Sequence, residues 1–292
     1  MSASISSPAT TSTVQRLEKI IRSMGNVLVA FSGGVDSSFL LKFAHDILGS
    51  GNVLAAIGDS VTLPRAELSA ALKFTEAYGI RSTVIKTDEL ANSLFLANPE
   101  DRCFYCKDEL FRKLLSVSEA EGIPCIVDGT NSDDLKGHRP GLRAAGAYGV
   151  RSPLAEAGLD KNSIRDLSRR MNLSTWNKPA MACLASRFPY GQTITPEALS
   201  KVEKAENILR EFGFRNVRVR SHLSRLEGPR QERLARIEVD RHRLADLLTT
   251  DIVQELKKLG FSYVCMDLEG FRSGSMNVKT VVEKPDTGGQ ES

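Results

Sequence analysis

The sequence predicts an α/β protein in which a parallel-sheet domain is followed by a smaller α+β domain. Apolar strand-like segments alternate with helix-like segments over the first part of the chain, which is typical of a parallel sheet covered on both faces. A serine- and glycine-rich loop, SGGVDS, stands between the first strand and a helix. After about Tyr190 the strands alternate polar and apolar residues, which suits a smaller sheet with one face open to solvent or to a site.

Apolar periodicity and glycine stops predict helices at residues 14–24, 37–48, 65–78, 107–120 and 164–171. Short runs of apolar and β-branched residues predict strands at residues 26–31, 53–57, 82–87, 125–130 and 173–176. The chain is expected to divide into a disordered leader, a first domain, a second domain and a disordered tail, at residues 1–13, 14–180, 181–280 and 281–292.

The second domain is expected to begin with a long helix. Thr195 and Pro196 look like its N-cap and first position, and Gly213 ends it. The segments NVRVR and ARIEV then alternate strictly, with apolar residues on one face and charged residues on the other. A helix over 243–259 and a strand at 263–268 complete this half.

The composition and the net charge limit which classes of protein are possible. The chain has 292 residues, of which 41% are hydrophobic and 26% are charged, as in ordinary globular proteins. The net charge of +3 gives no argument for a nucleic-acid partner. No apolar run approaches the length of a membrane span, and the N-terminal segment lacks the features of a signal or transit peptide. We therefore expect a cytoplasmic protein that binds neither nucleic acid nor membrane.

The loop SGGVDS has the chemistry of a phosphate site. Gly33 and Gly34 let the backbone approach an anion closely, and the following helix start presents free N–H groups. Three hydroxyls add further donors, from Ser32, Ser37 and Ser38. Asp36 is suited to orienting the loop or to holding a Mg²⁺ ion that bridges phosphates. The Walker pattern GxxxxGK(S/T) is absent, which excludes a kinase or GTPase loop, and an ordinary Gly-Gly turn is the alternative.

This loop resembles that of the PP-loop ATP pyrophosphatases, which implies cleavage of ATP to AMP and pyrophosphate through an adenylylated intermediate. In such folds the end of the second strand, with Asp59, seats adenine and ribose. The segment DGTNSDD brings Gly129 and Asp134 to the same edge of the sheet, where ligands bind in open α/β folds. A solvated turn with Asx hydrogen bonds is the alternative for Asp134 and the preferred interpretation for Asp133.

The five cysteines do not suggest a disulfide framework, because the number is odd and the chain is large. Cys103 and Cys106 form a CxxC pair just before a predicted helix, and Cys183 lies far along the chain. Three thiolates with one open position suit a 4Fe–4S cluster, whereas structural zinc needs about four ligands. A redox CxxC pair is the other option. Cys125 and Cys265 lie in apolar strands and are expected to be buried packing residues.

Taken together, these segments resemble the LarE family of ATP-dependent sulfur-insertion enzymes. The match runs from about Val14 to Asn277 and includes NPEDRCFYCK, DGTNSDDLKGHRPGLRAAGAYGVRSPL, WNKPAMACLASRFPYG, VRVR, ARIEV and DLEGFRSGSMN. It implies adenylylation of a carboxylate of pyridinium-3,5-biscarboxylic acid mononucleotide and its conversion to a thiocarboxylate, on the way to a nickel-pincer cofactor. The stretch at 221–233 departs from the family pattern and looks like an insertion.

The family has two sulfur chemistries. One form carries a lone cysteine in the CLxSR segment and sacrifices its sulfur. The other carries three cysteines and resembles an enzyme that passes on sulfide from a 4Fe–4S cluster. Cys103, Cys106 and Cys183 place this sequence with the second form, and we expect them to converge near the phosphate loop. The expected partners are the mononucleotide, sulfide or another sulfur donor, and further copies of the chain.

The resemblance also implies substrate and catalytic residues. Arg187 is expected to hold a substrate phosphate or carboxylate, with Arg218 and Arg220 as further candidates. An anion site at a subunit contact is expected at Arg272, Ser275 and Asn277. An acidic group facing Cys183 is expected from Glu206, Glu238 and Asp246. The alternative is that these charges are solvated surface groups.

Two other functions are weighed against this one. An RNA-thiolating PP-loop enzyme predicts a basic face or an appended RNA module, which the near-neutral charge does not favour. A nucleotide sensor with structural zinc predicts four metal ligands. The four histidines are not spaced as partners for the three cysteines, so the fourth ligand is missing.

Overall fold

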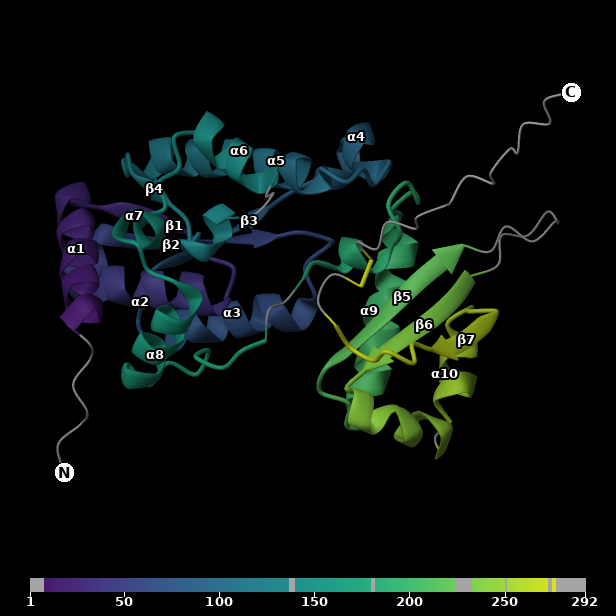
Figure 1. Cartoon of the computed structure of the whole chain (residues 1–292). Coiled ribbons are helices and arrows are strands. Elements are labelled where there is room, and N and C mark those ends of the chain that lie inside the picture. Colours follow the sequence, from purple (N-terminus) through teal and green to yellow (C-terminus); the bar gives the residue numbers. More distant parts are fainter. Residues whose placement is uncertain are drawn as a thin grey trace, which may run out of the picture. The chain divides into compact units, whose positions relative to one another are not determined.

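The computed structural model describes residues 8–136, 140–179, 182–223, 233–249, 251–272 and 275–276 (Figure 1). The chain forms two compact units. The first runs to Ala185 and also takes in Tyr190–Ser200, and the second comprises Ser186–Pro189 and the chain from Lys201 onward. The chain thus passes into the second unit at residue 186, returns to the first unit for residues 190–200, and then stays in the second unit. The sequence suggested a single boundary at 181.

The first unit contains a parallel four-stranded sheet. Its strands are β1 (Val27–Ala30), β2 (Val53–Asp59), β3 (Ser82–Lys86) and β4 (Ile126–Val127). They are ordered β3-β2-β1-β4, and all neighbours run parallel. From β1 the chain adds β2 and then β3 on one side of the sheet, and β4 pairs with β1 on the other side. The loops after β1 and β4 therefore flank the point where the strand order reverses, which is where open α/β sheets bind ligands.

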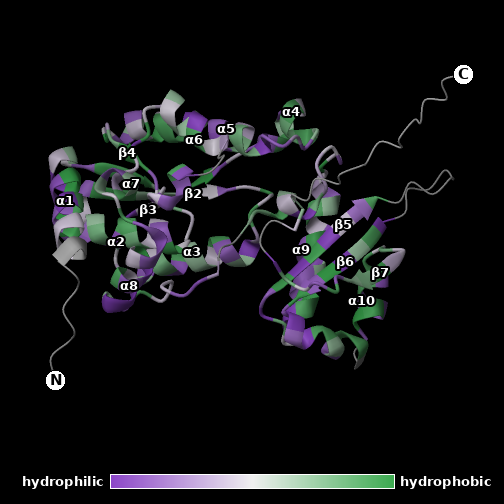
Figure 2. Ribbon diagram, in the orientation of Figure 1, coloured by the Kyte–Doolittle hydropathy of each residue, from purple (hydrophilic) through white to green (hydrophobic). Residues whose placement is uncertain are grey.

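Alternate residues of each strand point to opposite faces of this sheet, and helices cover both faces. Val27 and Val29 enter a core formed with α1 (Pro8–Met24), α2 (Val35–Leu48), α3 (Arg65–Ala77), α7 (Pro153–Ala157) and α8 (Lys161–Arg170). Leu28 enters a second core formed with α5 (Arg102–Glu121) and α6 (Pro140–Ala147). Figure 2 shows that hydrophobic and hydrophilic residues share the same helices, as two-sided packing requires.

Short elements complete the first unit and lead into the second. They are η1 (Ser50–Asn52), η2 (Glu89–Ala91), α4 (Ser93–Leu96), η3 (Asp133–Lys136) and η4 (Leu184–Arg187). In the described part of the chain, no helix is both long enough and apolar enough to span a membrane.

The second unit is a small α+β structure. Its elements are α9 (Pro196–Glu211, with its first turn in the first unit), β5 (Val217–Leu223), β6 (Arg233–Val239), η5 (Arg241–Thr249), α10 (Ile252–Lys258) and β7 (Tyr263–Met266). The sheet order is β5-β6-β7, with β5 antiparallel and β7 parallel to β6. Val217 and Val219 pack into a separate core with Leu209 of α9 and Leu256 of α10.

The structure confirms the predicted α/β class and corrects several elements. The first helix begins at Pro8, so part of the expected leader is helical. No strand forms at 173–176, because Asn172 takes a positive φ of 54° and the following residues turn. The helix expected at 243–259 is instead η5 followed by α10. The short helices α6 and α7 were not expected.

Two expectations fall largely or wholly outside the described residues. The expected insertion at 221–233 is described only at its two ends, where β5 finishes and β6 begins. The expected tail at 281–292 lies outside the described residues altogether.

Candidate active site

The phosphate loop joins β1 to α2 and is held by its own hydroxyl groups. The Oγ atoms of Ser37 and Ser32 lie 3.0 Å apart, and Ser37 Oγ also donates to the Gly34 carbonyl at 3.3 Å. Gly33 has a φ of +69°, and a Cβ there would lie 3.3 Å from the Cβ of Ala71 in α3. Positive φ and close packing both require glycine at this position. The loop is therefore shaped before any ligand binds.

The two carboxylate oxygens of Asp36, the second residue of α2, have different surroundings. Oδ2 forms an ion pair with Lys161 Nζ, whereas Oδ1 is buried with no hydrogen-bond partner among the described residues. Lys178 Nζ donates to the Gly33 carbonyl at 2.9 Å and pairs with Glu67 at 2.6 Å. Two lysines from distant segments thus fix the loop. An unpartnered carboxylate oxygen beside a phosphate loop has the chemistry of a Mg²⁺ ligand.

Gly129 follows β4 and lies against the start of α2. A Cβ on Gly129 would come within 2.8 Å of the backbone nitrogen of Ser37, so only glycine fits without a shift of the backbone. The preceding Asp128 shapes the turn with both carboxylate oxygens, because Oδ1 accepts from Ser152 Oγ at 2.7 Å and Oδ2 accepts from Thr130 Oγ1 at 2.9 Å. Gly129 therefore supports the phosphate loop by close backbone contact.

The acidic segment after β4 forms an Asx turn. The Asn131 side chain accepts hydrogen bonds from the backbone nitrogens of Asp133 and Asp134 at 2.9 and 3.1 Å. Asp133 is exposed, pairs with Lys136 at 2.7 Å and accepts from the backbone nitrogen of Lys161 at 3.0 Å. This is the alternative interpretation that the sequence left open. A role for Asp134 in ATP binding stays a prediction.

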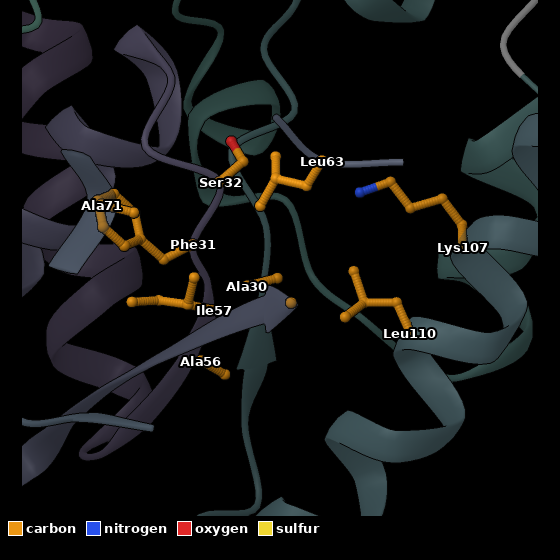
Figure 3. Close-up of a pocket in the computed structure, with 10 residues that line it drawn as sticks. Ala30, Phe31, Ser32, Ala56, Ile57, Leu63, Ala71, Lys107 and Leu110 are labelled. Carbon is orange, nitrogen blue, oxygen red and sulfur yellow. The ribbon is translucent and has the colours of Figure 1, made fainter. Parts of the chain in front are cut away.

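A pocket opens beside the phosphate loop, at the ends of β1 and β2 (Figure 3). It is lined by Ala30, Phe31, Ser32, Ala56, Ile57, Gly58, Leu63, Ala71, Lys107 and Leu110. The walls are mostly apolar, and the Lys107 side chain reaches from α5 toward Leu63. An apolar slot next to a phosphate loop suits an adenine ring, and an ammonium at its side suits a phosphate or carboxylate.

Asp59 lies close to this pocket, at the end of β2. Its carboxylate is ion-paired with the guanidinium of Arg65, which also donates to the carbonyl of Leu63 at 2.8 Å. Arg65 therefore holds Asp59 at the edge of the sheet next to the pocket residue Gly58. The expected contact between Asp59 and a ribose stays a prediction.

Cys103 and Cys106 lie in the first two turns of α5, because this helix begins at Arg102 rather than at residue 107. Residues three apart share a helix face. Burial raises the pKa of the Cys106 thiol well above its usual value, and the charges of Glu89 and Cys183 raise it further. Cys183 therefore lies close enough to act on Cys106 electrostatically, although the two are far apart in the sequence.

The three cysteines fit an iron–sulfur ligand set in their chemistry and in part of their placement. Two of them are electrostatic neighbours, and Cys103 is one helical turn from Cys106. Over the described residues, however, no group of three or more His, Cys, Asp or Glu side chains is close enough to hold a metal ion. Ligation would therefore have to draw the thiols closer together.

The other two cysteines are not alike. Cys125 packs against the core of the first unit, as expected, but it is only partly buried. Cys265 is exposed on β7, so the expectation that it is buried was wrong. Among the described strands β7 has β6 as its one neighbour, and its residues alternate between partly buried and exposed.

The second unit contains a buried arginine–glutamate network. Arg187 and Glu206 are each about 1% exposed and form an ion pair at 2.8 Å. Glu206 also accepts from Arg210 at 3.0 Å and from the backbone nitrogen of Val219 at 3.1 Å. The carboxylate is thus fully desolvated but well paired. A solvated surface charge, the alternative for Glu206, is wrong.

A second pair lies beside the first. Arg220 donates to Glu238 through Nε at 2.9 Å and Nη2 at 2.8 Å, and Glu238 is completely buried. Ser275 Oγ donates to the same carboxylate at 2.6 Å. Ser186 joins the two pairs, because its hydroxyl contacts Arg187 and its carbonyl accepts from Arg220. The charged face of β5 is therefore buried in a hydrogen-bonded network.

Arg218 is the arginine of this network that has no carboxylate partner among the described residues. It is 7% exposed, and its guanidinium lies 4.5 Å from the ring centroid of Phe271. Within the described residues no carboxylate is within ion-pair distance of it. Burial, with the positive charges of Arg187 and Arg220, lowers the pKa of Arg218 to about 10. A buried cation that faces two other cations is suited to binding an anion.

Other predicted site residues lie apart from this network or outside the description. Asp246 is on η5, with its side chain 47% exposed and paired with Arg243. Arg272 pairs with Glu269. Asn277 lies outside the described residues. The structure thus brings Glu206 and Glu238 into one network, and the expectation that they face Cys183 stays a prediction.

The sequence interpretation missed four charged residues. Lys161 and Lys178 contact the phosphate loop, Lys107 lines the pocket, and Glu89 contacts Cys106. Lys161 stands directly after an N-cap, Asp160, which marks a helix start whose position could have been predicted. The others carry no local signal, because their roles depend on contacts between distant segments.

A phosphate loop without a Walker lysine, at the switch point of a parallel sheet, defines a nucleotide-binding enzyme of the PP-loop ATP pyrophosphatase class. The NAD synthase family model matches residues 10–108. The pyridinium-3,5-bisthiocarboxylic acid mononucleotide synthase of Lactiplantibacillus plantarum is 37% identical over 88% of this chain and 91% of its own length. The chain belongs to this family of sulfur-transferring synthases, the LarE family.

Two further relatives extend over most of the chain. An uncharacterized protein of Synechocystis is 40% identical over 91% of this chain and 97% of its own length. An uncharacterized protein of Methanocaldococcus jannaschii is 30% identical over 85% of this chain and 91% of its own length. The similarity therefore includes both units and not the nucleotide-binding part alone.

Proposed function

We propose that this protein is an ATP-dependent sulfur insertase that adenylylates a carboxylate of pyridinium-3,5-biscarboxylic acid mononucleotide and converts it to a thiocarboxylate. The relative from Lactiplantibacillus plantarum is named for the bisthiocarboxylic product, which supports the choice of substrate. The observation that carries the proposal lies on α5. Lys107 lines the nucleotide pocket, and the thiol of its neighbour Cys106 is within electrostatic range of Cys183. Activation and sulfur delivery are thus served by one helix.

Adenylylation is required because a carboxylate is a poor electrophile with a poor leaving group. A substrate carboxylate oxygen attacks the α-phosphorus of ATP, the bond to the bridging oxygen breaks, and pyrophosphate leaves. In this step the phosphate loop holds the departing pyrophosphate, and Lys161 lies beside it. Mg²⁺, held by Asp36, would neutralise phosphate charge. Lys107, which lines the pocket, would contact the α-phosphate or the carboxylate.

Sulfur transfer then replaces the adenylyl group. Hydrosulfide attacks the acyl carbon, a C–S bond forms, and the C–O bond to AMP breaks, with AMP taking the electron pair. We assign the ligands of a 4Fe–4S cluster to Cys103, Cys106 and Cys183; such a cluster supplies an open iron that carries sulfide. Water must be excluded while the acyl adenylate waits for sulfur. The partly buried position of Cys106 serves that need.

The arginine network of the second unit is proposed to bind the substrate's charged groups. Arg187 and Arg220 already have carboxylate partners, whereas Arg218 lies against the ring of Phe271 and has no carboxylate partner among the described residues. The phosphate of the mononucleotide, or its second carboxylate, would supply the missing negative charge. Ser186 links the two paired arginines, whose positive charges add to that of Arg218.

The test is an anaerobic reaction with ATP, Mg²⁺, the biscarboxylic mononucleotide and sulfide. We expect AMP, pyrophosphate and a thiocarboxylate, together with visible absorbance and iron in the protein. Cys103→Ala and Cys106→Ala should lose the absorbance and the sulfur transfer, whereas Cys125→Ala should keep both. ADP as a product would refute the PP-loop chemistry. Full activity of both variants, with sulfur lost from Cys183, would replace the cluster by a sacrificial cysteine.

A further inference from the structure

The loop at residues 60–64 joins β2 to α3 and folds as a tight turn. Leu63 N donates to the carbonyl of Ser60 at 3.0 Å, and Thr62 N donates to Ser60 Oγ at 3.0 Å. The hydroxyls of Ser60 and Thr62 lie 2.8 Å apart, and both residues are buried. Leu63 lines the nucleotide pocket (Figure 3). The shape of this turn therefore determines one wall of the pocket.

Arg65, the first residue of α3, fixes this turn. Its guanidinium is ion-paired with Asp59 and donates to the carbonyls of Ser60 and Leu63. One planar group thus joins the end of β2 to two residues of the turn. The forked donors of a guanidinium permit such a set of contacts, whereas the ammonium of lysine is a point charge. Because Arg65 is half-exposed, its ion pair contributes little to the overall stability.

The same turn holds the segment that carries Cys183. Leu184 N donates to the carbonyl of Thr62 at 2.8 Å, and both residues are buried. A buried backbone hydrogen bond is costly to break, because neither group finds water as a substitute partner. On the other side of Cys183, Lys178 donates to the carbonyl of Gly33 in the phosphate loop at 2.9 Å. Cys183 therefore lies on a segment that is tied to the nucleotide site on both sides.

We propose that Arg65 is a positioning residue for both steps of the reaction: it fixes the turn at 60–64, which shapes the nucleotide pocket through Leu63 and places Cys183 through Thr62. The proposal rests on the proposed function, in which the pocket binds ATP and Cys183 takes part in sulfur delivery. Arg65 acts through the turn, and we assign it no contact with the reacting groups.

The phosphate loop does not depend on Arg65, because its own hydroxyls and two lysines hold it. Loss of Arg65 should therefore affect nucleotide affinity and the surroundings of Cys183, but not the chemistry at the phosphates. A split between these quantities distinguishes a positioning role from a general loss of structure.

The first measurement is substrate-dependent ATP–pyrophosphate exchange at varied ATP concentration. In Arg65→Met we expect the KM for ATP to rise at least about tenfold, as when a hydrogen bond from a charged group is lost, with kcat within about threefold. Arg65→Lys keeps the charge beside Asp59 but cannot reach both carbonyls, so its KM should be intermediate. Arg81→Met is the matched control, because Arg81 is equally exposed and ion-paired with Glu121, and its KM should not change.

The second measurement is the alkylation rate of each cysteine by iodoacetamide in the metal-free protein, read by peptide mass spectrometry. Cys183 is partly buried, and a loosened turn in Arg65→Met should make it react several-fold faster, since thiol reactivity depends on access. Cys125 and Cys265 are internal references whose rates should not change. Arg65→Lys allows the same comparison if the methionine variant does not fold.

Two results would overturn the inference: a KM for ATP in Arg65→Met within about threefold of that of the unaltered protein, or an unchanged alkylation rate of Cys183. Faster alkylation of Cys125 as well would mean a general loosening of the first unit and would also overturn it. If the unaltered protein showed no substrate-dependent exchange, the proposed function would fail, whereas the alkylation rates would still decide whether Arg65 places Cys183.

Discussion

The ammonium of Lys161, at the start of α8, is ion-paired with Oδ2 of Asp36 in the phosphate loop. Binding of Mg²⁺ and ATP would change this pair, because the metal and the ammonium compete for one carboxylate. The freed ammonium would then lie next to the phosphates. In the absence of nucleotide, Lys161 keeps Asp36 in its binding position, since the other oxygen of Asp36 has no partner among the described residues.

Lys161→Met should therefore lower substrate-dependent ATP–pyrophosphate exchange by about 10–100-fold, the loss expected when one hydrogen bond to a charged group is removed. Lys161→Arg should keep part of the rate, because it retains the charge. The measurement is the exchange rate at saturating Mg²⁺ and ATP. Lys136→Met, which removes an exposed lysine paired with Asp133, is the matched control and should be without effect. Equal rates for Lys161→Met and the unaltered protein would refute this role.

Arg218→Met should separate binding from stability. Because Arg218 is a buried cation near two others, its removal should leave the free energy of unfolding unchanged or raise it. Affinity for the mononucleotide should fall by about tenfold or more through loss of a charge-assisted contact. Calorimetric titration and denaturant unfolding measure the two effects. A variant that unfolds more easily and still binds substrate normally would contradict the anion-binding role.

The pH dependence of this effect has a definite sign. The pKa of Arg218 is lowered to about 10 in the folded protein, so the unfolded chain binds more protons above that pH. The unfavourable contribution of Arg218 to folding should be constant between about pH 6 and pH 9, where both states are protonated, and should shrink as the pH rises through about 10. Comparison of unfolding free energies of the unaltered protein and Arg218→Met across this range checks the prediction.

Glu206→Gln should destabilise the second unit strongly. The substitution leaves Arg187 buried without its counter-ion, and breaking one side of a buried pair typically costs about 3–5 kcal/mol. Asp246→Asn is the control, since its partly exposed pair with Arg243 should change stability by less than about 1 kcal/mol. Denaturant unfolding measures both. A loss below about 1 kcal/mol for Glu206→Gln would mean that the network contributes little to the fold.

Gly129→Ala should weaken ATP binding without unfolding the first unit. The added Cβ would come within 2.8 Å of the Ser37 backbone nitrogen, so the start of α2 and the phosphate loop must shift. Gly146→Ala is the control, because a Cβ there meets nothing within 4 Å inside α6 and should stabilise the helix by roughly 0.5–1 kcal/mol. Nucleotide titration measures the ATP affinity of both variants. ATP affinity as high in Gly129→Ala as in Gly146→Ala would contradict the role of Gly129.

The parts of the fold that the sequence predicted are those with a local signal. The strand before SGGVDS is a run of apolar residues, and the glycines at 33 and 34 mark the turn, so both were predictable from neighbouring residues alone. The buried state of Arg218 and Arg220 was not. Their alternation with Val217 and Val219 shows that two faces differ, but it does not show that η4 supplies Ser186 and Arg187 to cover the charged face.

Helix ends were predicted less well, for physical reasons that differ from case to case. α5 begins at Arg102 because Arg102 N and Phe104 N donate to the carbonyls of Pro99 and Asp101, so the residues before the apolar stretch already turn. The segment from Arg241 is first a 3₁₀ helix, η5, and then an α-helix, α10, and its short apolar pattern does not distinguish the two forms. Lys161 and Lys178 act across long sequence separations, which no periodicity reports.

The most direct test of the account is the balance between ATP consumed, thiocarboxylate formed and sulfur retained in the protein. In an anaerobic reaction with excess substrate and sulfide, we expect one AMP for each thiocarboxylate, several turnovers per chain, and an unchanged mass of the recovered polypeptide. ATP cleaved to ADP, or cleaved to AMP with no thiocarboxylate formed, would contradict the proposed function. A single turnover in which Cys183 loses its sulfur would keep the adenylylation step and contradict sulfur delivery by a cluster.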